Sequence, residues 1–156
     1  LLQFVVKTAA EIGELGDNTA VLRKRISEDA NLAEILTQEK VRGSILGHTR
    51  WASVGVISEA NAHPVDSQEI NNSDKPYVSA VLNGDIDNYM DLTELQNLDV
   101  SPEITTDAKV VPTLISKQLT SNSNDLEAFR ATVSTFEGSM AIASHSADQP
   151  TNCHSH

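Results

Sequence analysis

Short apolar runs of strand type and longer stretches with helical periodicity follow one another along this chain without strict alternation. The clearest strand candidate is Tyr77 to Asn83 (YVSAVLN), which stops abruptly at the pair Asn83-Gly84, a pair typical of a turn. A doubly wound parallel sheet would need strands and helices in regular alternation. The observed order therefore favours an α+β fold in layers, and the 156 residues are expected to form one domain.

Three other runs are predicted to be strands, and one stretch a loop. The apolar run Gln3 to Lys7 and the run Ser44 to Trp51 are both typical of buried strands, and SMAIAS after Gly138 is the last strand candidate. The segment Ser58 to Lys75 is rich in Asn, Asp, Ser and Glu, which indicates a loop.

Four stretches carry apolar residues at helical spacing. The first has Asn18 as a candidate cap and runs to Leu36 as one helix or two, and the second has Asp87 as its cap and ends before Pro102. Thr106 or Asp107 can cap the third, in which proline falls near the first turn, where it costs least. The fourth is indicated by the spacing of Leu126, Phe129, Val133 and Phe136.

Charge and hydropathy exclude several kinds of partner. Eleven basic and 22 acidic residues give a net charge of −11, which repels nucleic acid and anionic lipid surfaces. No apolar run approaches the roughly 18 residues of a membrane-spanning helix, and the N-terminus lacks the pattern of a signal peptide.

The single cysteine, Cys153, forms no internal disulfide, which favours a reducing compartment and hence the cytoplasm. With His154 and His156 it suggests a metal site only weakly, because a fourth ligand at fixed spacing is missing and a frayed tail explains the three residues better.

Five short motifs occur in a definite order. They are LGHTRWASVG (46–55), NAHP (61–64), VLNGDIDNY (81–89), TTDAKVVPTLI (105–115) and FEGSMAIA (136–143). Together they resemble the class II, or N-terminal-nucleophile, glutamine amidotransferases, and among these the branch of glucosamine-6-phosphate synthase. Each motif is short enough to arise by chance, but five in the right order make coincidence a poor explanation.

The resemblance implies a four-layer αββα sandwich of two antiparallel sheets between helices, incomplete here, so that residues 1–156 would be part of a domain truncated at both ends. It implies an enzyme that hydrolyses L-glutamine to glutamate and passes ammonia to fructose-6-phosphate, or a similar sugar phosphate, bound in a separate isomerase domain. It also implies a homo-oligomeric parent protein, and neither a cofactor nor a metal ion.

The resemblance assigns the two charged ends of glutamine to two positions. Arg50 would hold the α-carboxylate through the planar fork of its guanidinium, and Asp107 would bind the α-ammonium. Ser53 would add a hydroxyl contact, and Trp51 would cover the substrate. Taken alone, Arg50 would be a surface or ion-paired arginine, Asp107 a helix cap and Trp51 a core residue.

The resemblance also assigns an oxyanion hole. The side-chain amide of Asn83 and the backbone N–H of Gly84 would stabilise the tetrahedral intermediate, although the same pair alone is more often a plain turn. His48 and His63 receive no catalytic role, and we expect them to hold strand and loop together by hydrogen bonds.

Two features depart from the family pattern. The family's nucleophile is an N-terminal cysteine, whereas this sequence begins with Leu1-Leu2, and Val54 stands where histidine is common. We expect truncation, which leaves this chain inactive by itself. The alternatives are a non-catalytic glutamine-binding or regulatory domain that has lost the nucleophile, and a class II relative that supplies ammonia to another acceptor.

Overall fold

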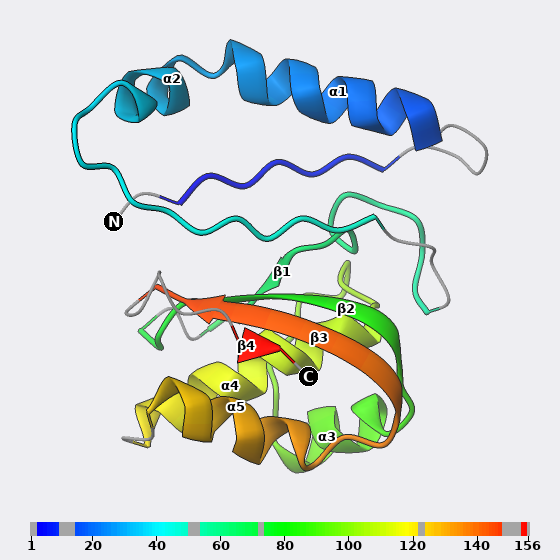
Figure 1. Cartoon of the computed structure of the whole chain (residues 1–156). Coiled ribbons are helices and arrows are strands. Elements are labelled where there is room, and N and C mark those ends of the chain that lie inside the picture. The colour runs from blue at the N-terminus through cyan, green and yellow to red at the C-terminus, as the bar shows by residue number, and fades with distance from the viewer. Residues whose placement is uncertain are drawn as a thin grey trace.

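The computed structural model describes residues 3–9, 15–49, 54–71, 74–121, 124–147 and 154–155. Its helices are α1 (Leu15–Glu28), α2 (Ala30–Leu36), α3 (Tyr89–Leu95), the 3₁₀ turn η1 (Asp107–Lys109), α4 (Val110–Thr120) and α5 (Asp125–Val133). Its strands are β1 (Val65–Asp66), β2 (Val78–Ile86), β3 (Gly138–Ser146) and β4 (His154–Ser155). Figure 1 shows α1 and α2 on one side of the sheet and the other helices on the opposite side. The predicted α+β class is confirmed.

The strands form one antiparallel sheet in the order β1-β2-β3-β4. Its long pair, β2 and β3, runs in unbroken register from Val78 opposite Ser146 to Ile86 opposite Gly138. The other two strands have two residues each. The predicted strands at 77–83 and 139–144 are therefore present, each somewhat longer than predicted.

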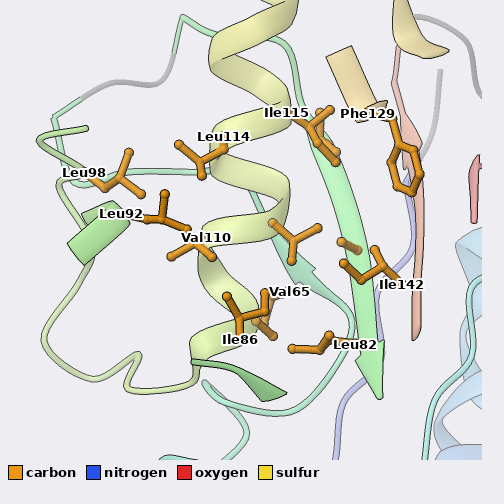
Figure 2. Close-up of a cluster of buried hydrophobic side chains, with 14 of the residues drawn as sticks. Val65, Leu82, Ile86, Leu92, Leu98, Val110, Leu114, Ile115, Phe129 and Ile142 are labelled. Carbon is orange, nitrogen blue, oxygen red and sulfur yellow. The ribbon is translucent and has the colours of Figure 1, made fainter. Parts of the chain in front are cut away.

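The hydrophobic core lies between this sheet and the helices α4 and α5 (Figure 2). Alternate residues of β2 point to this side, because side chains along a strand alternate between its two faces. Val110, Val111, Leu114 and Ile115 of α4 pack against them, and Phe129 of α5 and Ile142 of β3 close the cluster. The predicted helical periodicity after Asp107 thus marks a face that is buried on the sheet.

Two extended segments, residues 3–9 and 41–49, lie between the sheet and the pair α1 and α2 in Figure 1. Gln3 Nε2 donates to Ser79 Oγ of β2 at 3.1 Å, so the first segment reaches the sheet. Neither segment is a strand, so the strands predicted at 3–7 and 44–49 are wrong, and residues 50 and 51 of the second lie outside the described residues. A strand needs a paired neighbour, and the carbonyl of Lys7 instead accepts from Arg25 Nη1 at 2.6 Å.

Several predicted boundaries differ from the structure. Asn18 lies inside α1, and the stretch to Leu36 is two helices because Asp29 caps the second by accepting from Leu32 N. Asn88, and not Asp87, stands at the N-cap of α3. The amide of Asp87 donates to the carbonyl of Glu137, the residue before β3.

Two other predictions need correction. The segment 58–75 contains the short strand β1, which pairs with β2 through Val65 and Asp66. Phe136 lies beyond the end of α5 but still packs against the core. It therefore fits the apolar spacing because it is partly buried, and not because it belongs to the helix.

Candidate functional site

Asp107 stands in η1, directly after Thr106, whose hydroxyl accepts from the amide of Ala108 at 3.4 Å and so caps the turn, as predicted. The Asp107 side chain is buried, with 3% of the residue exposed. Its Oδ2 accepts from the backbone N–H of Ile86 at 2.8 Å, and its Oδ1 accepts from the Thr106 hydroxyl at 3.3 Å. The carboxylate is thereby anchored to the end of β2.

Asn83 and Gly84 lie in β2, two or three residues before Ile86. The predicted turn at this pair is wrong, because both residues pair with β3, Asn83 opposite Ala141 and Gly84 opposite Met140. Both are exposed, whereas most of β2 is buried. The pair is therefore accessible at two or three residues from Ile86, whose amide binds Asp107.

Gly84 explains why a turn-like sequence sits inside a strand. Its φ is +111°, a conformation that residues with a side chain rarely adopt. A Cβ atom at this position would lie 2.0 Å from the carbonyl oxygen of Ser139, so the two strands approach too closely for any side chain. Glycine at position 84 is thus required by a close contact between β2 and β3.

Asn61 of the NAHP motif makes hydrogen bonds to several backbone groups, a role that the sequence analysis did not assign to it. It is fully buried, with 0% exposed. Its Oδ1 accepts from the amides of Thr105 and Thr106, at 2.8 and 3.1 Å, and its Nδ2 donates to the carbonyl of Val56 at 3.1 Å. A loop asparagine has no periodicity to mark it, and its place in the motif was the only available signal.

The two motif histidines contact each other. His48 and His63 approach with their Nδ1 atoms 3.1 Å apart and their rings edge to face. Since one nitrogen must donate and the other accept, the pair is joined by a hydrogen bond in one tautomeric arrangement. This contact joins the extended segment 41–49 to the NAHP loop, as predicted for these residues.

Lys109 fixes η1 to the strand on its other side. Its Nζ donates to the carbonyl oxygens of Asp66 and Gln68, at 2.7 and 2.6 Å, and lies 3.5 Å from the Asp66 carboxylate. Burial lowers the pKa of Lys109, although the Asp66 carboxylate opposes the shift. With Asp107 held by β2 and Lys109 held at β1, the turn is fixed at both ends.

The remaining predicted residues are Arg50, Trp51 and Ser53, and all three lie outside the described residues. The structure describes the chain again from Val54 on. There Gly55 packs closely against Thr105, and the Val56 amide donates to the Thr105 hydroxyl. The structure thus gathers parts of four motifs around Asp107, namely residues 55–56, Asn61, Ile86 and 105–107. Cys153 and His156 of the tail also lie outside the described residues, and His154 is in β4.

A separate open pocket of about 620 Å³ lies on the N-terminal side. It is lined by residues 4–7, by Arg25 and by three acidic residues, Glu28, Asp29 and Glu59. Arg25 Nη1 donates a hydrogen bond to the Lys7 carbonyl and forms an ion pair with Glu59 Oε1 at 3.2 Å. The motif residues around Asp107 do not line this pocket.

Within the described part of the chain, no helix is both long and apolar enough to cross a bilayer.

Comparison with known proteins gives consistent relatives. The chain is 34% identical over 144 residues to the isomerizing glutamine-fructose-6-phosphate aminotransferase of Acinetobacter baylyi, a match that covers 91% of this chain and 22% of that protein. The proteins of the same name from Clostridium tetani and Sulfolobus acidocaldarius are also 34% identical, over 91% and 84% of this chain. No protein-family model matches. The chain thus spans about a fifth of the length of these relatives, and the matches confirm the resemblance predicted from the five motifs.

Proposed function

We propose, from the homology of this chain to glutamine-fructose-6-phosphate aminotransferases, that it is part of a glutaminase domain that releases ammonia from L-glutamine. The observation that carries the proposal is the 34% identity over 91% of the chain to an enzyme of that name. The meeting of four motifs around Asp107 adds support. The matched relatives are named as enzymes, which gives no support to the non-catalytic alternative.

The proposed architecture is the four-layer αββα sandwich, of which residues 1–156 would form a part. Support comes from the order of the layers in Figure 1, where α1 and α2, two extended segments, the sheet and the helices α3 to α5 follow one another. In this proposal the extended segments 3–9 and 41–49 occupy the layer of the second sheet, although neither is a strand in this structure.

Asp107 is proposed to bind the α-ammonium of glutamine. An ionised carboxylate has about four acceptor positions, and the Ile86 amide and the Thr106 hydroxyl occupy two of them. These donors keep the carboxylate oriented and leave acceptor capacity for an ammonium group. Arg50 would hold the α-carboxylate by two parallel hydrogen bonds, Ser53 would add a hydroxyl contact, and Trp51 would cover the bound amino acid.

Asn83 and Gly84 are proposed as the oxyanion hole. Attack on the side-chain amide of glutamine places negative charge on its oxygen, and the Asn83 amide and the Gly84 N–H would donate to it. Their exposure on β2 supports this role, since a reacting group must be able to approach them. The attacking thiolate would come from an N-terminal cysteine outside this sequence, with its own α-amino group as the base.

The ammonia would be passed to fructose-6-phosphate, or a similar sugar phosphate, in an isomerase domain of the same protein. This part of the proposal rests on the names of the relatives, of which the chain covers about a fifth. A homo-oligomeric parent protein, with no cofactor, stays a prediction from the motif resemblance.

The test is the kinetics of glutamine hydrolysis in a protein that joins this chain to a cysteine-bearing N-terminal segment. Arg50→Ala and Asp107→Asn should each raise KM for glutamine about tenfold or more, because each removes a charge-assisted hydrogen bond worth about 1.5–3 kcal/mol. Asp91→Asn is the matched control, since Asp91 is an exposed carboxylate on α3. Unchanged kinetics in both site variants would refute the assignment.

A further inference from the structure

The two ends of the proposed glutamine clamp lie on different segments of the chain. Asp107 stands in η1, whereas Arg50 and Ser53 precede the loop at 54–56. Because the α-ammonium and the α-carboxylate are attached to the same carbon atom, the two protein groups must keep one fixed separation. An error of about 1 Å in such positioning can cost about 100-fold in rate. Some contact must therefore hold the loop at 54–56 against the segment that leads into Asp107.

We propose that the Asn61 side chain and the Thr105 hydroxyl are that contact, and that they act as positioning residues for glutamine binding. The inference rests on the function proposed above. One carboxamide bonds both segments at once, because Asn61 Oδ1 accepts from two successive amides, those of Thr105 and Thr106, while its Nδ2 donates to the carbonyl of Val56. The residue after those two amides is Asp107.

The Thr105 hydroxyl closes the same junction. It accepts from the amide of Val56 at 3.2 Å and from Asn61 Nδ2 at 3.1 Å. Gly55 allows the approach, because a Cβ atom at this position would lie 2.8 Å from Thr105 Oγ1, and its φ is +85°. We refer to Asn61 and the Thr105 hydroxyl together as the clasp.

The two members of the clasp differ in burial, since Asn61 is buried and Thr105 is exposed. Asn61 is fully buried, so removing its side chain leaves backbone amides and a carbonyl without their partner. Thr105 is exposed, and its side chain can be changed with little loss of packing. Thr105→Val removes the hydroxyl but keeps the shape, and Thr105→Ser keeps the hydroxyl. Asn61→Ala removes the carboxamide and its hydrogen bonds but leaves the bond from the Val56 amide to the Thr105 hydroxyl.

The test compares two ligands in each variant. L-Glutamine carries both charged ends, whereas 4-aminobutanamide lacks the carboxylate. The Kd of 4-aminobutanamide divided by the Kd of L-glutamine therefore measures what the second charged end adds. Loss of folded protein raises both Kd values by the same factor and leaves this ratio unchanged. Loss of positioning lowers the ratio, because the two ends can no longer be bound together without strain.

The ratio should be measured by NMR titration, with each ligand, of the protein that joins this chain to the N-terminal segment, with its cysteine changed to alanine so that glutamine is not hydrolysed. We expect it to fall about tenfold or more in Thr105→Val and Asn61→Ala, and to stay at the wild-type value in Thr105→Ser. Thr93→Val is a second control, because the Thr93 hydroxyl donates to the Tyr89 carbonyl within α3. Thr105→Val keeps the experiment informative if Asn61→Ala does not fold.

The outcomes separate the two proposals. If the joined protein with an unchanged clasp binds L-glutamine and the ratio is unchanged in Thr105→Val, the clasp has no positioning role and only this inference is overturned. If the joined protein with an unchanged clasp does not bind L-glutamine, the proposed function fails and the inference fails with it.

Discussion

The two sides of the sheet are stabilised in different ways. On the side of α4 and α5 the chain builds a continuous apolar cluster, whose members all lie between Val65 and Ile142. On the other side, described residues 3–9 and 15–49 contribute nothing to this cluster, and α2 has no buried residue. Ile45 there is 95% exposed. Polar contacts, such as Gln3 to Ser79 and His48 to His63, join this layer to the rest.

The residues of the proposed site come from segments of both kinds. Asp107 and Gly84 stand on elements that the apolar core holds in place, whereas Arg50 follows a segment joined by polar contacts. Regions with few buried apolar contacts open with smaller free energies than the core does. The ammonium end of the site should therefore be the rigid end, and the carboxylate end should depend on contacts such as those of Asn61.

The largest expected effect tests this difference directly. Ile86→Ala should lower the free energy of unfolding by about 2–5 kcal/mol, because Ile86 is 1% exposed and its loss leaves a cavity in the core. Ile45→Ala, the matched change on the other side, should stay within about 0.5 kcal/mol. Urea unfolding measures both. Equal losses in the two variants would contradict the contrast.

A smaller effect compares two helix caps of the same kind. Asn124 Oδ1 accepts from Glu127 N in α5, and Asp29 Oδ1 accepts from Leu32 N in α2. Asn124→Ala should cost about 1 kcal/mol of global stability, because α5 packs on the core. Asp29→Ala should leave the unfolding midpoint unchanged and speed hydrogen exchange only in α2. A global loss of the same size in Asp29→Ala would show that the N-terminal layer unfolds together with the core.

The smallest expected effect is a pH dependence at Glu69, on the core side. Burial alone would raise the pKa of Glu69, but its ion pair with Lys75 and its hydrogen bond from the Asp99 amide outweigh burial and lower it. Between the lowered folded pKa and the ordinary value of 4.5, the unfolded chain binds more protons. This stabilisation is complete above the ordinary pKa and is lost as the pH falls through the folded one.

Glu69→Gln removes the titrating group. The variant should lose less stability than the wild type between about pH 6 and pH 3, as measured by urea unfolding across that range. Parallel losses in the two proteins would mean that the ion pair does not form in solution.

The core side was also the side that the sequence predicted well. Tyr77 to Asn83 and the apolar spacing after Asp107 marked β2 and α4, because both elements bury one face and burial creates periodicity. The prediction failed at Gln3 to Lys7, where an apolar run has no paired neighbour among the described residues. Composition indicates the tendency to form a strand, but pairing depends on a partner elsewhere in the chain.

The candidate site was predictable only in part. Asp107 was located correctly at the start of a helical segment, and Asn83-Gly84 was misread as a turn because positive φ serves both tight turns and close strand contacts. Buried polar residues such as Asn61 and Lys109 were missed, since hydrogen bonds between distant segments leave no local pattern. Arg50 belongs to the residues that the structure does not describe, and its role stays a prediction.

The most direct test of the account is an NMR titration with L-glutamine of the nitrogen-labelled protein that joins this chain to the N-terminal segment, with its cysteine changed to alanine. If the amino acid binds between Asp107 and the Asn83-Gly84 pair, the amides of Gly84, Ile86 and Asp107 should shift first and saturate together, with residues 54–56 following the same curve. Shifts that are absent, or that are confined to residues 4–7 and Arg25 around the separate pocket, would contradict the proposed site.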